Sequence, residues 1–172
     1  MNTALAYASG IHRAHNCLYD GQPYSVHLEH VWDIANQYAY LCEIPGEEQQ
    51  HVFAAAACHD LLEDTTLSYN DLVKEIGVKA ADIVYNVTNE LGKNRHERAL
   101  KTYPKIASCS NSTFVKLCDR LANIRYSSQS GSSMFEKYKK EHTEFKEQLQ
   151  KRNQQGEHKA LWNEIEKELA RK

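Results

Sequence analysis

Apolar residues recur at intervals of three and four along most of the chain, which is the spacing of one face of an α-helix. Within the segment 25–42, for example, Val31, Ile34 and Tyr38 form such a stripe. The same criterion predicts helices over residues 3–18, 25–42, 47–64, 68–77, 79–90, 95–109, 113–126, 134–150 and 158–170. No segment alternates apolar and polar residues as a half-buried strand would. The pattern therefore predicts an all-α fold.

The breaks between these helices carry residues that are typical of turns and caps. Residues 19–24 combine Asp, Gly and Pro, and Gly77 suits the position just after a helix end. Ser68 followed by Asp71 resembles a capping box with Asp in place of Glu. Pro104 lies inside the helix 95–109, so we expect that helix to be kinked or to begin again there.

The length and composition support a helical domain with a sizeable core. The 172 residues suffice for one domain, or for one domain with a short appendage. Only 7 glycines and 3 prolines are present, which favours helices over a sandwich or barrel. We expect residues 1–150 to form the main body and residues 151–172 to add a covering helix to the same domain. The mixed charges of that last helix also suit a dimer contact.

The charge and the cysteines narrow the class of protein. With a net charge of -2 and no dominant basic face, the chain does not have the character of a nucleic-acid-binding protein. Its five cysteines form no C-x-x-C pair, which suggests a reducing compartment. Neither a signal peptide nor a long apolar run is present. We therefore expect a cytoplasmic protein that binds neither nucleic acid nor membranes.

The stretch 53–65 joins the alanine-rich part of a predicted helix to a cluster of polar residues. His59 and Glu63 are four residues apart, as are Asp60 and Asp64, so each pair lies on one face of a helix. The alternative is that these are solvated residues at a helix end. Acidic residues are unfavourable at a helix C-terminus, where the dipole is negative, so a nearby cation is the better explanation.

Two further residues have a matching context on other predicted helices. The resulting ligand candidates are His27, His59, Asp60 and Asp119, each in an apolar segment that would face the core. A buried carboxylate needs a partner, and a cation is the simplest one. Two imidazoles and two carboxylates without a thiolate suit Mn²⁺, Fe²⁺ or Zn²⁺ better than a structural zinc site.

The neighbouring carboxylates predict hydrolytic chemistry at such an ion. A divalent ion makes hydroxide available near neutral pH and polarises a phosphoryl oxygen. Glu63 and Asp64 can then orient the water and protonate the leaving oxygen, and closely placed like charges raise the pKa of one carboxyl. Asn123 follows Asp119 by four residues, where it either binds a ribose or phosphate oxygen or is an ordinary surface residue.

Three motifs in combination resemble a known family. PYSVH at 23–27, HDLLEDT at 59–65 and VKLCDRLANIR at 115–125 are similar to the HD-type hydrolase domain of RelA/SpoT proteins. The match is closest to the single-domain form, the small alarmone hydrolases, and covers residues 5–150. The resemblance implies an HD-domain helical bundle of about eight to nine helices with a metal site in its core.

The resemblance also implies roles for the candidate residues. Mn²⁺ would be bound by His27, His59, Asp60 and Asp119, while Glu63 and Asp64 would form the catalytic pair and Asn123 would contact the nucleotide sugar. The implied reaction removes the 3′-pyrophosphate from an alarmone of the stringent response, ppGpp or pppGpp, or from ppApp. Its products from the guanosine substrates are GDP or GTP and pyrophosphate. A homodimer and a functional pairing with an alarmone synthetase remain open as partners.

The loop before the Pro-Tyr pair departs from the family pattern. Residues 17–22 read CLYDGQ in place of a basic Gln-x-Arg-Lys-like stretch, and Ala122 stands where the family often has His. We expect Tyr19 to replace an arginine that stacks on the base, and a tyrosine ring stacks on purines without choosing among them. The preference for guanine or adenine therefore stays open.

Other basic residues are candidates for contacts with substrate phosphates. They are Arg13, Lys93, Arg95 and Arg125, and for each of them a solvated surface charge is the favoured alternative. Two other functions remain open for the whole chain. One is an HD-family nucleotidase or dinucleotide 2′-phosphatase, and the other is an inactive nucleotide-binding module.

Overall fold

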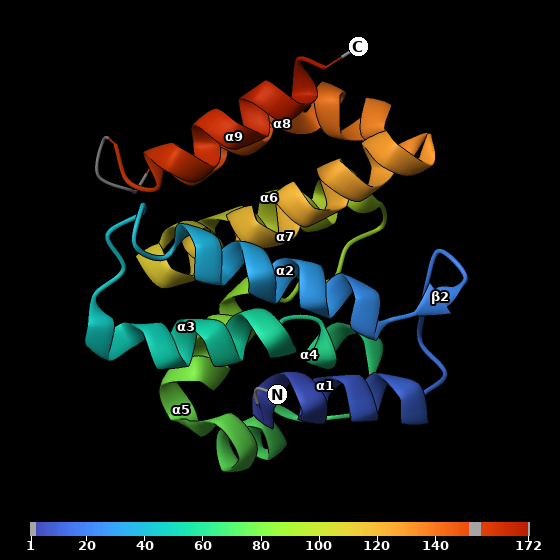
Figure 1. Cartoon of the computed structure of the whole chain (residues 1–172), viewed down its shortest axis with the longest axis vertical. Helices are drawn as coiled ribbons and strands as arrows, with labels where there is room; N and C mark the ends of the chain where they lie inside the picture. The colour runs from blue at the N-terminus through green and yellow to red at the C-terminus, as the bar shows by residue number, and fades with distance from the viewer. Residues whose placement is uncertain (1–2, 152–155, 172) are drawn as a thin grey trace.

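Helices dominate the chain in the computed structural model, which describes residues 3–151 and 156–171 (Figure 1). The elements are α1 (Thr3–Ala14), β1 (Leu18–Tyr19), β2 (Gln22–Pro23), α2 (Ser25–Tyr38), α3 (Gly46–Cys58), α4 (Leu61–Asp64), α5 (Tyr69–Val87), α6 (Arg95–Ala107), α7 (Ser110–Ser130), α8 (Met134–Gln150) and α9 (Lys159–Leu169). The helices stack in tiers, with α1 and α5 at one end and α8 and α9 at the other (Figure 1). The prediction of an all-α fold is confirmed.

A small hairpin, which the sequence indicated only as a turn, precedes α2. Leu18 pairs with Pro23 and Tyr19 with Gln22 in an antiparallel arrangement. Asp20 and Gly21 at its tip both have positive φ, 51° and 80°, as two-residue hairpin turns require. Strands of two residues are too short to show alternation, so the pattern did not reveal them. The hairpin projects beside the N-terminal end of α2 (Figure 1).

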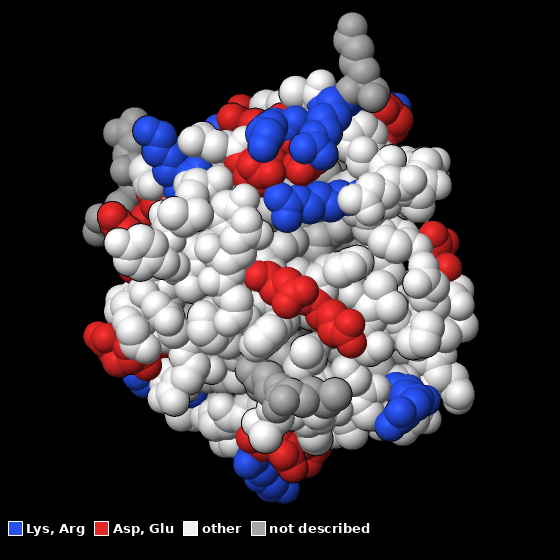
Figure 2. Space-filling model, viewed as in Figure 1, with Lys and Arg blue, Asp and Glu red and all other residues white. Residues whose placement is uncertain are grey.

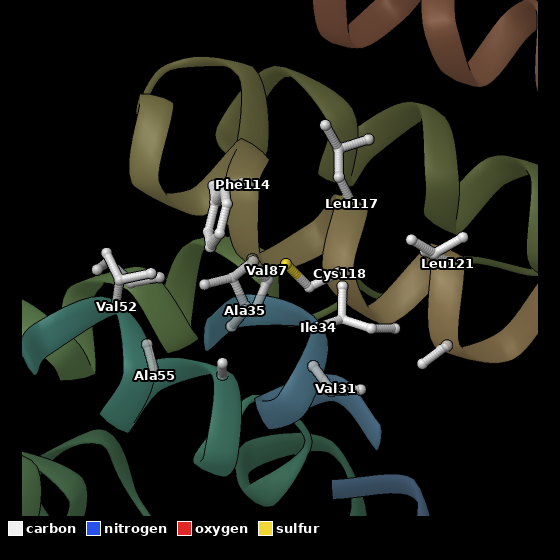
Figure 3. Packing of buried hydrophobic residues seen from close by; sticks show 14 of the residues in the cluster. Val31, Ile34, Ala35, Val52, Ala55, Val87, Phe114, Leu117, Cys118 and Leu121 are labelled. Atoms are coloured by element: carbon white, nitrogen blue, oxygen red, sulfur yellow. The ribbon is translucent and has the colours of Figure 1, made fainter. Parts of the chain in front are cut away.

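The core lies where α2 and α3 pack against α7. Buried residues of α2 and α7 face one another, and the small side chains of α3 lie beside them (Figure 3). The labelled residues in this region are Val31, Ile34, Ala35, Val52, Ala55, Val87, Phe114, Leu117, Cys118 and Leu121. Alanines at positions 55–57 are fully buried, which lets neighbouring helices approach closely. The helix that leads to the polar cluster is therefore held on several sides.

The helix expected to run through residues 47–64 is broken. The α3 helix ends at Cys58, and α4 begins at Leu61. Asp60 sits at the break with φ −96° and ψ −3°, a sparsely populated backbone region that is common at functional sites. The Asp64 N–H still donates to the Asp60 carbonyl at 3.0 Å. The acidic pair 63–64 therefore belongs to a separate single turn rather than to the end of the long helix.

Two predicted helix signals are confirmed in α5. The Ser68 hydroxyl accepts from the Asp71 N–H, and the Asp71 carboxylate accepts from the Ser68 N–H, so the capping box is complete. At Gly77 the chain leaves helical geometry with a φ of 78°, which an L side chain rarely adopts. The two segments predicted on either side of Gly77 are thus the two halves of α5. In α6, by contrast, the helix runs through Pro104.

The last helix, α9, covers α7 and is tied to it by charge. Arg125 of α7 forms ion pairs with Glu164 at 2.9 Å and with Glu168 at 3.3 Å. On the face in Figure 2, the largest group of charged side chains lies in this region, with blue and red side by side. The division of the chain at residue 150 stays a prediction. None of the helices in the described part of the chain combines the length and apolar character of a membrane span.

Candidate active site

Four polar side chains from three parts of the chain converge on one point in the core. His27 comes from the start of α2, His59 and Asp60 from the break after α3, and Asp119 from the middle of α7. The Nε2 atoms of the two histidines are 3.2 Å apart. His59 Nε2 lies 2.9 Å from Asp60 Oδ2, and His27 Nε2 lies 3.4 Å from Asp119 Oδ1. The structure thus brings together all four ligand candidates named from the sequence.

The hydrogen bonds of His59 orient its ring toward this point. Its Nδ1 lies 2.9 Å from the Ala56 carbonyl, which can only accept, so Nδ1 carries the proton. That tautomer leaves the Nε2 lone pair of the neutral ring directed at the cluster, as in most metal-binding histidines. His27 also directs Nε2 at the cluster, and both rings are almost fully buried, with 2% exposure.

The two carboxylates are each fixed by further partners. Tyr24 donates from its hydroxyl to Asp60 Oδ2 at 2.6 Å. Lys116, one helical turn before Asp119, donates to Asp119 Oδ2 at 2.9 Å. The Lys116 bond leaves Asp119 Oδ1 directed at the histidines, because a carboxylate can use its two oxygens separately.

The charges in the cluster support one another. Burial by itself raises the pKa of Asp60, but the imidazoles of His59 and His27 outweigh it and hold the pKa well below the ordinary value. Burial likewise lowers the pKa of His59, and the Asp60 and Asp119 carboxylates reverse this and raise the pKa well above its ordinary value. The carboxylates therefore attract positive charge to the point where the histidine nitrogens meet, whether it is carried by protons or by a metal ion.

This donor set fits a divalent metal ion. His27, His59 and Asp60 each offer an atom within 4.8 Å of the others, and the Asp119 oxygen lies beside them. Two imidazole nitrogens and two carboxylate oxygens suit borderline ions such as Mn²⁺, Fe²⁺ or Zn²⁺. Metal binding to such a set releases the protons that the histidines otherwise hold. The residues present are thus appropriate ligands for a divalent metal ion.

Glu63 lies beside the cluster and lines a cavity of about 190 Å³ that opens onto it. Both of its carboxylate oxygens accept hydrogen bonds from Asn89, Oε1 from the backbone N–H at 2.7 Å and Oε2 from the side-chain amide at 2.8 Å. Glu63 is therefore held in one orientation within reach of anything bound in the cavity.

Asp64 occupies a different position, next to the Tyr24 hydroxyl and outside the lining of that cavity. Burial, followed by the charge of Asp60, raises the pKa of Asp64 above its ordinary value of 3.8. A carboxyl with a raised pKa holds a proton more readily, as a general acid must. The two neighbouring carboxylates therefore have distinct environments.

Three cationic side chains line the cavity beside the histidine–aspartate cluster. Lys116, Arg95 and Arg120 all border it, and a second hollow lined by the same three residues continues from it. Arg95 donates twice to Glu141 of α8, at 2.7 and 3.1 Å, and Arg120 donates to the same carboxylate at 3.3 Å. The second hollow is lined by Arg95, Arg98, Lys116 and Arg120 against Glu141 and Glu144, so positive charge predominates there, which suits an anionic substrate.

Tyr19 and Asn123 lie together at the cavity wall. The Tyr19 ring stacks on the His27 ring with centroids 4.7 Å apart, and its hydroxyl donates to Asn123 Oδ1 at 2.9 Å. Asn123 Nδ2 donates in turn to both the carbonyl and the carboxylate of Asp119. Asn123 thus links the hairpin to a ligand candidate, and both residues line the cavity.

The other basic candidates lie elsewhere. Arg13 is exposed at the end of α1, and Lys93 is exposed in the loop before α6. Arg125 pairs with α9, as described above. None of the three lines the cavity beside the histidines. Among the four basic residues named from the sequence, Arg95 is the one that lines the cavity.

Some residues of the site were not identified from the sequence. Tyr24 and Lys116 each lie three residues before a ligand candidate, His27 and Asp119, so helical spacing could have indicated them. Asn89 and Glu141 gave no such signal, because their partners are 26 and 46 residues away in the chain.

The fold and the site together define a predominantly helical protein with a buried histidine–aspartate cluster that could hold a divalent metal and an adjoining acidic pair. No family model matches the chain. It is similar to guanosine-3′,5′-bis(diphosphate) 3′-pyrophosphohydrolase MESH1 of Danio rerio, with 32% identity over 107 residues, covering 62% of this chain and 56% of that protein. The corresponding MESH1 of Drosophila melanogaster is 31% identical over 104 residues, covering 60% of this chain and 55% of that protein.

A solved structure shares the fold. It is described as a metazoan ortholog of SpoT that hydrolyzes ppGpp and plays a role in starvation responses, and it matches with a TM-score of 0.70 and 23% identity over 97% of this chain and 93% of that one. The chain spans about half the length of the curated relatives it matches. The helical-bundle fold and the similarity to alarmone hydrolases expected from the sequence are confirmed.

Proposed function

We propose that this protein is a metal-dependent hydrolase that removes the 3′-pyrophosphate from a nucleotide alarmone, ppGpp, pppGpp or ppApp. The observation that carries the proposal is the convergence of His27, His59, Asp60 and Asp119 beside the Glu63–Asp64 pair. The similarity to two 3′-pyrophosphohydrolases named MESH1 supports the choice of reaction.

The proposed chemistry assigns one task to each group. A divalent ion, for which we propose Mn²⁺, would supply a nucleophilic water near neutral pH and polarise a phosphoryl oxygen. Glu63 lines the cavity and orients the water for attack on the phosphorus of the 3′-diphosphate. Asp64, whose pKa is raised mainly by burial, is the general acid of the pair and supplies a proton to the departing oxygen of the sugar.

The remaining cavity residues would bind the substrate. Arg95, together with Lys116 and Arg120, offers positive charge to the phosphates. Asn123 contacts the sugar and the Tyr19 ring contacts the base, in keeping with their places at the cavity wall. The positions of Arg13, Lys93 and Arg125 give no support for substrate contacts. A cytoplasmic location, a homodimer and a functional pairing with an alarmone synthetase stay predictions.

The identity of the reaction products tests the proposed function. Purified protein loaded with Mn²⁺ is incubated with ppGpp, pppGpp and ppApp, and the products are separated by ion exchange. Release of pyrophosphate with the matching nucleoside diphosphate or triphosphate is the expected result. Orthophosphate alone would indicate a nucleotidase or a dinucleotide 2′-phosphatase, and binding without turnover by the metal-loaded protein would indicate an inactive module.

A further inference from the structure

We propose that Asn89 is a positioning residue that sets the orientation of the Glu63 carboxylate toward the reacting phosphate. This inference rests on the proposed function, since it concerns how Glu63 performs its part in that reaction. Asn89 belongs to none of the three motifs that carry the resemblance, and it lies 26 residues from Glu63 in the chain.

Asn89 holds the Glu63 carboxylate by both of its oxygens, and we call this pair of hydrogen bonds the clasp. One residue donates to both oxygens of the carboxylate, its backbone N–H to Oε1 at 2.7 Å and its side-chain amide to Oε2 at 2.8 Å. Two parallel hydrogen bonds define the plane of a carboxylate as well as its position. A single hydrogen bond would leave Glu63, at the end of a flexible side chain on a helix of one turn, free to rotate.

The clasp is itself anchored on both sides. Before it, the Thr88 N–H and hydroxyl both bond to the Val84 carbonyl, at 3.0 and 2.8 Å, which secures the end of α5. After it, the Glu90 N–H donates to the Thr102 hydroxyl of α6 at 2.9 Å. The segment that carries Asn89 is therefore tied to two helices, so the orientation of Glu63 follows from the packing of α5 and α6.

The clasp leaves Glu63 able to act. Each carboxylate oxygen has two lone pairs, and Asn89 uses one on each oxygen. The remaining lone pairs are available to a water molecule in the cavity, which both Asn89 and Glu63 line. A general base must be within hydrogen-bond reach of the proton it receives, so a fixed carboxylate plane contributes directly to its efficiency.

A contact of this kind could also serve only to join α4 to the end of α5. The two roles differ in what the loss of the amide changes. A purely structural link would affect stability and metal content, whereas a positioning role affects kcat through Glu63 and leaves substrate binding and metal content as they were.

Asn89→Ala removes the side-chain donor and keeps the backbone one. We expect kcat for pyrophosphate release to fall about 10- to 100-fold, with KM and Mn²⁺ content unchanged. Asn89→Asp has the same shape but places a like charge against Glu63, and it should lose at least as much. The matched control is Asn86→Ala, since Asn86 lies three residues earlier and donates to the Ser112 hydroxyl at 3.2 Å, away from the cavity. It should retain the wild-type kcat.

A double-mutant cycle shows whether Asn89 acts through Glu63. In a Glu63→Gln background, Asn89→Ala should lower kcat little further, because the group it positions has already lost its function. Backbone and side-chain amide resonances of Asn89, assigned by NMR in the protein loaded with diamagnetic Zn²⁺, should also shift in Glu63→Gln and stay in place in Asn86→Ala. Additive losses in the cycle, or Asn89 resonances that do not respond to Glu63→Gln, would overturn the inference while leaving the proposed function intact. No pyrophosphate from metal-loaded wild type would refute the proposed function and, with it, this role of Asn89.

Discussion

The Tyr24 hydroxyl donates a 2.6 Å hydrogen bond to Asp60 Oδ2, the same oxygen that lies 2.9 Å from His59 Nε2. Burial, followed by the charge of Asp60, raises the pKa of Tyr24, so its hydroxyl keeps its proton and remains a donor. The Tyr24 ring is in turn stacked on the buried His12 ring, with centroids 4.3 Å apart. A packed aromatic pair thus fixes the direction of one of the proposed metal ligands.

Removing this hydroxyl should weaken metal binding. Partners of this kind typically contribute a factor of about 10 to 100 in metal affinity, and we expect a loss of that order for Tyr24→Phe in a Mn²⁺ titration. Tyr69→Phe is a matched control, because Tyr69 also donates to an aspartate, Asp82, but on the surface. Equal affinities for the two variants would show that Tyr24 does not orient Asp60.

Substitutions of the proposed metal ligands and of the acidic pair should have different effects on metal content and on rate. Asp119→Ala removes a charged group that the other three ligands cannot replace, so we expect a metal-poor protein. Glu63→Gln and Asp64→Asn preserve shape and should keep the metal while losing about 10²–10⁴ in rate. Elemental analysis measures the metal content of each variant, and the turnover number measures its rate. Loss of metal from the two amide variants as complete as from Asp119→Ala would place the pair among the ligands instead.

Two arginines should give contrasting phenotypes. Arg95→Ala removes a positive group at the cavity, and we expect KM for the alarmone to rise about tenfold with the fold intact. Arg125→Ala should leave KM unchanged and lower the free energy of unfolding by about 1–3 kcal/mol, because it deprives the buried Glu168 of a partner. Steady-state kinetics and urea unfolding on both variants test the contrast, which an unchanged KM for Arg95→Ala would contradict.

Stability should fall with decreasing pH in part through His158, at the start of α9. Burial lowers the pKa of His158 below its ordinary value of 6.5, and its Nε2 bonds to Ser110. Between this lowered pKa and the ordinary value of 6.5, the histidine therefore holds a proton in the unfolded chain but not in the native one. The stabilisation is present above that pH and is lost as the pH falls toward the lowered value, by at most about 1.4 kcal/mol per pH unit.

His158→Asn tests this dependence. The residue has a φ of 54°, which Asn tolerates better than most side chains, and Asn does not titrate. Urea unfolding at several pH values between 5 and 7.5 should show a shallower decline for the variant than for the wild type. Parallel curves would mean that other groups account for the acid sensitivity.

The helices and the ligand set could be predicted from the sequence because both depend on the spacing of residues along the chain. Apolar intervals of three and four identify a helix and its buried face, and the same rule places Lys116 one turn from Asp119. The break at Asp60 was not predicted, since a continuous helical pattern does not reveal a bend that the packing of His59 and Asp60 requires.

The contacts that give the site its shape were decided only by the tertiary structure. Tyr19 and Asn123 are 104 residues apart, and Asn89 and Glu63 are 26 apart, so no local pattern connects them. Arg95 and Arg125 look alike as basic residues on helices, yet one borders the cavity and the other pairs with α9. Spacing determines which side chains share a helix face, whereas the packing of the helices against one another determines which faces meet.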